Sequence, residues 1–549
     1  MLGQEPGSHA PERSAQGRSL SPPSSASTPA SFKQVIDTVV QRERFFVAQM
    51  RHFHPLVETY VQNLKGNEEK AVPVSDQYFL GRLQIANGPE EVGFKDEPGF
   101  RQHFMSKLTG LFRMKFLPLG FAQMVMLDDD FKAKDYNFGF VRREFLSEVR
   151  CLVIDVQPKQ KSSSGRFIGR MWVEDQNYNI VRFNGTYVSR PHERPYLHFD
   201  SWRLNLRPGV WLPAYIYSEE SNTASWEGHD FHFKAQTRLW GYDLHRLRGD
   251  SEFTQIVVDA AQGVKDQNDG GQDASPLESE RKWEHQAEDN AIERLQNIGL
   301  LAPPGDVDKI LMTVINNLIV TNNLDIEPEV RARVLLTTPL ESFTVGHTIV
   351  LSRGLLDVLP DEASLAMVLA HELAHIALGH RLDTELAFGD RMFFPDVETF
   401  ERLDFRRSLS DEEAADAKAM DLLAKSPYKD KLGNAGLFLK QLQLNAPVLR
   451  NLIRPHFGDR LVSGKTTRMA ALLSSAPDQE PERTDQIAAL PLGARIRVDP
   501  WSDRAELIKT TPVALVSPRE RMPFEVSPFF PFLKRSSGDE STAATTSPR

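Results

Sequence analysis

The spacing of apolar and polar residues changes several times along the chain. In 31–64 the apolar residues recur at intervals of three and four, which is typical of amphipathic helices, and Ser31 stands where a helix cap is expected. From about 135 to 248, short aromatic-rich runs alternate with polar residues and end at turn sequences, which predicts antiparallel strands. The helical spacing returns from residue 286, interrupted by two short strand-like runs.

These changes predict an α+β protein, in which a mostly antiparallel β domain precedes a mainly helical domain that contains a short sheet. The polar stretch between them is typical of a linker, and low-complexity sequence at both ends indicates disorder. The predicted parts are a disordered N-terminus over 1–31, a helical N-terminal segment over 32–130, the β domain over 131–248, the linker over 249–285, the helical domain over 286–475 and an extended, partly disordered tail over 476–549.

Composition narrows the classes of partner. Of the 549 residues, 40% are hydrophobic and 26% charged, which is the balance of a globular protein with a sizeable core. The net charge of −10 argues against nucleic acid as a main partner, because phosphate binding requires a basic surface. The single cysteine, Cys151, excludes an internal disulfide and a metal site built from cysteines alone.

No stretch of the sequence predicts a membrane-spanning helix. The two most apolar candidates, 108–127 and 309–323, are interrupted by charge or are short and rich in amides. The first residues contain no apolar segment of the kind found in signal peptides, yet their composition resembles the beginning of a mature exported protein. We therefore expect an exported or periplasmic protein, with a cytoplasmic location as the alternative. Peripheral association with a membrane is compatible with either.

One apolar run contains groups that an ordinary core helix lacks. The sequence LAMVLAHELAHIALGHRL, residues 365–382, places His371 and His375 four residues apart, so both imidazoles project from one helix face, about 6 Å apart along the axis. Asp361 is the expected N-cap of this helix. Glu372 lies about 100° round from His371, where it can reach a metal-bound water without sharing the metal.

This pattern is HExxH, in which two histidines bind zinc and the glutamate takes a proton from the bound water. The alternative is a set of ordinary histidines, but burying two imidazoles and a carboxylate without partners costs several kcal/mol. The pattern therefore predicts that His371 and His375 bind Zn²⁺ and that Glu372 is the catalytic base. His380 does not lie on the ligand face, and we expect it to be structural.

A third protein ligand is expected, because catalytic zinc sites use three. The positions that a metzincin would use hold Leu378 and Arg381, so the sequence indicates a carboxylate on a later helix. In RRSLSDEEAADAKAMDLLAK, Ser410 is the expected N-cap, and Glu413 would complete its capping box.

Under this register Glu412 is left to face the metal. Asp416, four residues further on, lies on the same helix face and could hold the other nitrogen of a histidine ligand. From spacing alone, a solvated acidic first turn that the helix dipole favours explains these acidic residues equally well.

Three motifs follow one another along the chain: RVLLTTPLESFTVGHTIVLSRGLLDVL, DEASLAMVLAHELAHIALGH and SLSDEEAAD. With them, the region 330–470 resembles zinc metallopeptidase family 48, which includes the CAAX-prenyl endopeptidases and the HtpX heat-shock protease. The resemblance implies a gluzincin-type peptidase domain over 286–475 with one Zn²⁺ per chain. It also implies Glu412 as the third zinc ligand, Asp416 as its supporting carboxylate and Arg468 as support for the oxyanion or substrate.

Two positions depart from the family pattern. Glu341-Ser342-Phe343 stands where the family has Asn-Ala-Phe before its edge strand. Val462 stands where a late histidine helps to stabilise the oxyanion, and His456 is the nearest substitute. The second difference bears on catalytic efficiency and not on zinc binding.

The resemblance implies a zinc-dependent metalloendopeptidase that hydrolyses protein or peptide substrates. The strand 347–352 is expected to pair with the extended substrate backbone. The alternative is a catalytically weak or vestigial peptidase that acts as a chaperone, or as a lipid- or lipoprotein-binding protein through its β domain. The pattern of short strands predicted for that domain resembles the half-barrel sheets of bacterial lipoprotein carriers. The sequence does not indicate an oligomeric state.

Overall fold

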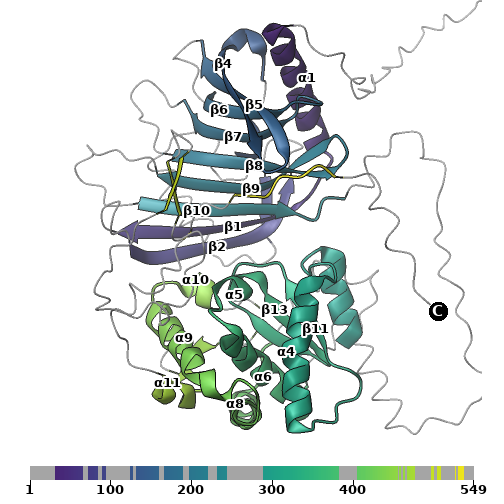
Figure 1. The fold of residues 1–549 in the computed structure, drawn as a ribbon, viewed down its shortest axis with the longest axis vertical. Coiled ribbons are helices and arrows are strands. Elements are labelled where there is room, and N and C mark those ends of the chain that lie inside the picture. The colour runs from purple at the N-terminus through teal and green to yellow at the C-terminus, as the bar shows by residue number, and fades with distance from the viewer. Residues whose placement is uncertain are drawn as a thin grey trace, which may run out of the picture.

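A computed structural model shows two units, a large β-sheet unit and a helical unit below it in Figure 1. The predicted disordered N-terminus before residue 31 and the predicted linker 249–285 lie outside the residues that the structure describes. The described residues are 31–65, 72–84, 90–93, 124–127, 131–159, 166–188, 197–220, 232–243, 288–381, 405–454, 457–458, 461–463, 466–476, 496–499, 504–507, 526 and 530–536.

The β-sheet unit contains one antiparallel sheet of ten described strands, as the alternating pattern predicts. Their spatial order is β3-β2-β1-β10-β9-β8-β7-β6-β5-β4, so β4 to β10 form a meander and β1 is added beside β10. The strands are β1 (Leu56–Lys65), β2 (Val72–Gln84), β3 (Glu90–Gly93), β4 (Tyr136–Leu146), β5 (Val149–Pro158), β6 (Phe167–Glu174), β7 (Ile180–Tyr187), β8 (Leu197–Arg207), β9 (Val210–Glu220) and β10 (His232–Trp240).

The predicted helical segment over 32–130 is wrong beyond residue 50. Helix α1 (Phe32–Met50) begins at the Ser31 cap, but β1 follows after a short connection. Both faces of β1 are buried, so its apolar residues lack the two-residue alternation that marks a half-exposed strand. Their spacing instead imitates a helix: Leu56, Val57, Tyr60 and Val61.

The two faces of the sheet have different covers. Helix α1 and residues 124–127 pack on one face and form a separate apolar core with it. The opposite face packs against the helical unit near β1, β2 and β10, and against Val526 and residues 530–536 of the predicted tail. These described tail residues are extended, and they lie across the sheet rather than as an added strand.

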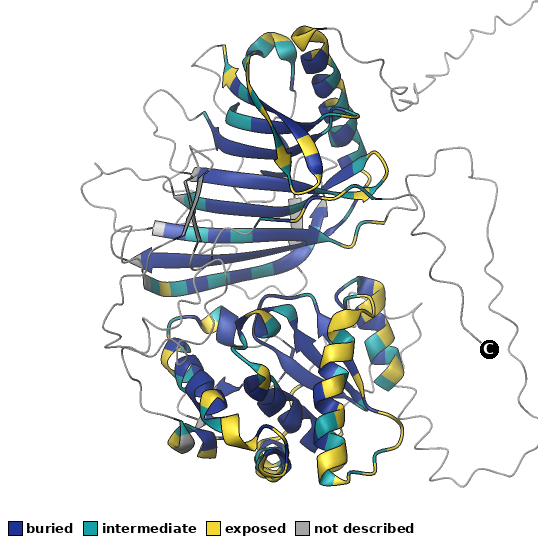
Figure 2. Cartoon of the chain, in the orientation of Figure 1, coloured by how far each residue is buried: buried dark blue, intermediate teal, exposed yellow. Residues whose placement is uncertain are grey.

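The helical unit surrounds a three-stranded sheet, in the order β11-β13-β12. Helix α6 lies inside the unit and is almost entirely buried, whereas α4 exposes one face to solvent (Figure 2). None of the described helices combines the length and the apolar character needed to cross a membrane. The elements are a helix over 288–298, α4 (Asp306–Asn322), β11 (Arg331–Leu335), β12 (Ser342–Val345), β13 (Thr348–Ser352), α5 (Arg353–Val358), α6 (Glu362–Ala377), α8 (Leu409–Ala424), α9 (Leu432–Asn445), α10 (Arg450–Ile453), β14 (Val462–Ser463), β15 (Thr466–Thr467) and α11 (Ala471–Ser475). Further along the chain, β16 (Ile496–Asp499) pairs with β17 (Arg504–Leu507).

Two buried carboxylates of the sheet attach the helical unit to it. Glu58 accepts hydrogen bonds from the backbone N–H and the hydroxyl of Thr338, at 2.5 and 2.8 Å, and forms an ion pair with Arg238. Asp76 accepts the backbone N–H groups of Asn451 and Leu452, at 3.0 and 2.7 Å. A continuous apolar core joins the two units around these contacts.

Candidate metal centre

Helix α6 carries the HExxH residues, and its start is the predicted one. The Asp361 side chain accepts a hydrogen bond from Ser364 N at 2.8 Å, which caps the helix. The helix ends before Gly379, whose φ of +69° is the left-handed conformation that glycine adopts most readily. His371, Glu372 and His375 lie in the last two turns, and each is no more than 2% exposed.

The N-cap of helix α8 lies two residues before the predicted one. Ser408, and not Ser410, is the N-cap, and its hydroxyl accepts a hydrogen bond from Asp411 N at 3.2 Å. Both serines precede acidic residues at a suitable spacing, so the sequence alone did not decide between them. Glu413 is exposed and has no capping role, whereas Glu412 is fully buried toward α6.

The helices α6 and α8 bring three donor groups together. Nε2 of His371 lies 3.2 Å from Nε2 of His375. Nε2 of His371 lies 3.4 Å from Oε2 of Glu412, and Nε2 of His375 lies 3.3 Å from Oε1 of Glu412. All three donor atoms lie within 4.8 Å of one another. A tetrahedral zinc ion with bonds of about 2.0–2.1 Å has ligand-to-ligand distances of about 3.3–3.4 Å. The residues therefore fit the Zn²⁺ ion that the sequence predicts.

The other ring nitrogen of each histidine also has a partner. Nδ1 of His371 lies 3.0 Å from Asp416, which also accepts a hydrogen bond from Met469 N. Nδ1 of His375 lies 2.9 Å from Nδ1 of His380. The interpretation of His380 as merely structural is therefore incomplete, because the chain turns back after Gly379 and returns this ring to His375. Spacing counted along a helix could not show this contact.

Glu372 is held by a residue that the sequence analysis did not single out. The hydroxyl of Thr344, on β12, donates a hydrogen bond of 2.6 Å to Oε2 of Glu372. Arg407 in turn donates to the backbone carbonyl of Thr344 at 2.9 Å. Thr344 directly follows Glu341-Ser342-Phe343, the stretch that departs from the family pattern, and this departure was the available signal.

Arg468, which directly follows β15, also contacts the candidate metal centre. Its Nε lies 3.0 Å from Oε2 of Glu412, so the guanidinium contacts the third candidate ligand. Val462 is buried in β14, close to Arg468 through the β14–β15 pair. His456 lies outside the described part of the chain.

The predicted substrate-pairing strand is wrong. Residues 348–352 form β13, which lies between β11 and β12, so both of its edges are already paired. Among the described strands, β11 and β12 are the two edges of this sheet, and β12 carries Thr344. The apolar run of β13 is the usual pattern of a central, fully buried strand.

The two histidines have pKa values shifted in opposite directions in the metal-free protein. Burial by itself lowers the pKa of His371, but hydrogen bonds to Asp416 and Glu412 outweigh it and raise the pKa to about 10. Burial lowers the pKa of His375, and its hydrogen bond to Glu412 opposes this only in part. The difference follows from Asp416, because His371 has two carboxylate partners and His375 has one.

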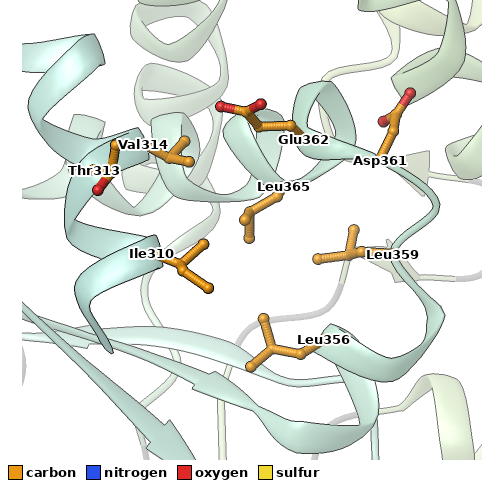
Figure 3. A pocket seen from close by; sticks show the side chains of 8 residues that line it. All are labelled: Ile310, Thr313, Val314, Leu356, Leu359, Asp361, Glu362 and Leu365. Carbon is orange, nitrogen blue, oxygen red and sulfur yellow. The ribbon is translucent and has the colours of Figure 1, made fainter. Parts of the chain in front are cut away.

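An apolar groove of ≈ 460 Å³ lies elsewhere on this unit (Figure 3). It is formed by α4, α5 and the first turn of α6, with Ile310, Leu356 and Leu359 among its lining residues. None of the candidate ligands lines it. The candidate site of this unit is therefore identified from its possible metal ligands and not from this groove.

A comparison with known protein families matches the part of the chain that contains both candidate histidine ligands. Residues 308–393 match the family model described as Peptidase family M48, a stretch that contains His371, Glu372 and His375 but ends before Glu412. This match supports a metallopeptidase in that part of the chain; the CAAX-prenyl and HtpX subtypes remain predictions. No curated protein matches the chain significantly.

Two solved structures are similar to the chain at low scores. One is a LolA superfamily protein from Nitrosomonas europaea, with 8% identity, coverage of 39% of this chain and 93% of that chain, and a TM-score of 0.21. The other is a putative outer membrane lipoprotein-sorting protein domain from Vibrio parahaemolyticus, with 11% identity, coverage of 37% and 94%, and a TM-score of 0.20. At such scores the likeness carries no functional argument.

Proposed function

We propose that this protein is a zinc-dependent metalloendopeptidase acting on protein or peptide substrates. The observation that carries the proposal is the convergence of His371, His375 and Glu412, whose ligand atoms all lie within 4.8 Å of one another and whose two Nε2 atoms are 3.2 Å apart, close to the edge length of a zinc tetrahedron. The match of residues 308–393 to a metallopeptidase family supports it.

The residues around the ion have separate tasks in this proposal. When bound, zinc acts as a Lewis acid that lowers the pKa of a water molecule and polarises the scissile carbonyl. Thr344 holds Oε2 of Glu372, so Oε1 takes the proton from the water and later delivers it to the leaving amine.

The histidine partners orient the ligands. Asp416 holds Nδ1 of His371, and His380 holds Nδ1 of His375, so each ring presents Nε2 to the metal. The near-complete burial of the ligands strengthens electrostatic interactions within the site.

Replacing Glu372 by Gln tests the proposal. The ligands remain, so zinc content should be unchanged, while hydrolysis of casein should fall by about 10²–10⁴-fold because the proton acceptor is lost. Glu362→Gln, the same change in the first turn of α6, should retain both zinc and activity.

A second candidate is a zinc-binding protein with little or no hydrolytic activity that acts as a chaperone or carrier. Val462, at the position of the late histidine, favours it, because a buried aliphatic side chain cannot donate to an oxyanion. Purified wild-type protein that contains zinc but leaves casein intact would select this candidate.

An exported or periplasmic location is part of the proposal. Its support is the sheet-rich N-terminal half of the described chain. Fractionation of the native organism, with sequencing of the N-terminus of the mature protein, tests it. Recovery from the cytosol would reject it.

A further inference from the structure

The C-terminal residues 530–536 lie across the sheet on the face opposite α1. Leu533 is the centre of the contact: its carbonyl accepts from Glu148 N at 3.1 Å, and its N–H donates to the Ser147 hydroxyl at 3.2 Å. Further along, Ser536 N donates to the side chain of Asn205 at 2.7 Å. The sheet thus recognises mainly the backbone of this segment, and such recognition tolerates many sequences.

Two side chains of the segment make specific contacts. Arg535 forms a 2.9 Å ion pair with Glu174, a carboxylate that is fully buried at the end of β6. Five residues earlier, Phe530 packs edge-on against Trp202, with 5.8 Å between ring centroids. By contrast, Phe532 is 65% exposed, so it points away from the sheet. The segment therefore binds the sheet like a peptide held by two side chains, the aromatic Phe530 and the basic Arg535.

This face of the sheet carries buried donors for which the described residues supply no acceptor. They are Trp202 Nε1, Trp211 Nε1 and Asn184 Nδ2. All three donors lie on the face opposite α1. The two indoles belong to the apolar core on that face. Asn184 lies two residues after Arg182 on β7 and so points to the same face, and Arg182 stacks on Trp202. Buried donors without acceptors are destabilising, so the present cover does not satisfy this face completely and its exchange for another peptide leaves no hydrogen bond of these donors broken.

Charge favours the same kind of ligand. Glu174 and Asp175 together face Arg535, at 2.9 and 3.6 Å, in a chain whose net charge is −10. The resident segment is basic, with Lys534 beside Arg535. An incoming peptide that carries a basic residue would compensate the same carboxylates.

We propose that this face of the sheet is a peptide-binding site, and that Val526 and residues 530–536 occupy it as a displaceable internal ligand. The site would take an extended polypeptide with an aromatic residue and, five positions later, a basic residue. The proposal concerns a second site and does not depend on hydrolysis at the metal centre.

Competition between the internal segment and an added peptide tests this. The probe is a fluorescently labelled synthetic peptide of residues 526–536, and binding is followed by anisotropy. Full-length wild type should bind it weakly, because a tethered competitor acts at an effective concentration of about millimolar. Full-length Phe530→Ala/Arg535→Glu should bind it at least about tenfold more tightly, because its own segment no longer competes. A peptide with the same two changes should bind neither protein.

Each other outcome opposes the proposal. Equal binding by wild type and variant would place the peptide elsewhere, and no binding by a folded variant would make the segment a fixed part of the structure. If the double variant does not fold, the single Arg535→Glu change decides, because Arg535 is partly exposed and its removal leaves the apolar packing intact. Adding Glu372→Gln, which abolishes only the proposed hydrolysis, should leave peptide binding unchanged.

Discussion

The sheet and the metal centre both bury charge, but they do so in different ways. In the sheet, Arg203 places its two terminal nitrogens 2.7 Å from the two oxygens of Glu43, and Arg182 binds Asp200 in the same two-pronged manner at 2.8 and 2.9 Å. At the metal centre, His371, His375 and Glu412 face one another at 3.2–3.4 Å instead.

This difference separates a structural cluster from a metal site. Each of these carboxylates in the sheet unit is paired with a guanidinium at hydrogen-bond distances, so the two charges of each pair compensate each other within the protein. At the candidate metal centre the two histidines and the Glu412 carboxylate converge on a common point, and although Arg468 lies 3.0 Å from Glu412, a metal ion between the three groups would complete the set. Distances among buried polar atoms therefore distinguish the two cases where burial alone does not.

The largest expected effect is the loss of the metal from Glu412→Ala. This change removes one of three ligands, so zinc content and hydrolysis should both be lost. Zinc measured on the dialysed protein checks it. The matched control is Glu413→Ala, one residue away on the same helix but exposed, which should retain zinc and activity. The opposite result would mean that Glu413 is the ligand.

The next effect concerns the sheet and should leave zinc untouched. Arg203→Ala strands the Glu43 carboxylate in the core, so the free energy of unfolding should fall by about 3–5 kcal/mol, as measured by denaturant titration. Replacing both residues by apolar ones, as in Glu43→Leu/Arg203→Met, should recover most of it, because no uncompensated charge remains. If the double variant is no more stable than Arg203→Ala, the pair is not a closed structural unit.

A smaller loss is expected from the partners of the ligands. Asp416→Ala and His380→Ala each leave all three ligands in place, so zinc affinity should fall by about 10- to 100-fold without disappearing. Competition with a chelator measures it. His380→Asn, which retains a polar group near Nδ1 of His375, should lose less than His380→Ala. Equal affinity of wild type and His380→Ala would return His380 to a purely structural role.

The smallest effect is a pH trend confined to the metal-free protein. The pKa of His371 is about 10 in the folded chain and about 6.5 when unfolded, so its contribution to stability is complete below pH 6.5 and is lost as pH rises through 10. The melting temperature of the chelated protein should therefore fall by a few degrees across that window. The lowered pKa of His375 acts only below pH 6.5. The zinc-loaded protein should lack the trend, since its histidines are already deprotonated at the ligand atom.

Sequence reasoning succeeded where local geometry decides position. The four-residue interval between His371 and His375 and the cap at Asp361 are properties of one helix, and the structure reproduces both. It failed where tertiary burial changes the pattern. The prediction of a helix at β1 was wrong because both faces of this strand are buried, which removes the alternation of apolar and polar residues. The prediction of an edge strand at β13 was wrong because the periodicity of a strand does not determine which strands pair with it.

The remaining site residues depend on contacts between distant segments. Thr344 meets Glu372 only because β12 runs alongside α6, and Arg468 reaches Glu412 from beyond α10. The return of His380 to His375 needs the turn at Gly379, which no spacing rule within the helix foresees. Such contacts become visible only when the chain is folded.

The attachment through Glu58 has a consequence for how the molecule holds together. Thr338, which gives two hydrogen bonds to Glu58, stands six residues before Thr344, which holds the proposed catalytic base. Separating the units would leave a carboxylate of the sheet without these donors and would open a continuous apolar core. The connection over 249–285 is therefore a boundary along the polypeptide but not a boundary between autonomous folding units. The sheet and the peptidase region form one cooperative block, in which melting of either removes the support of the other.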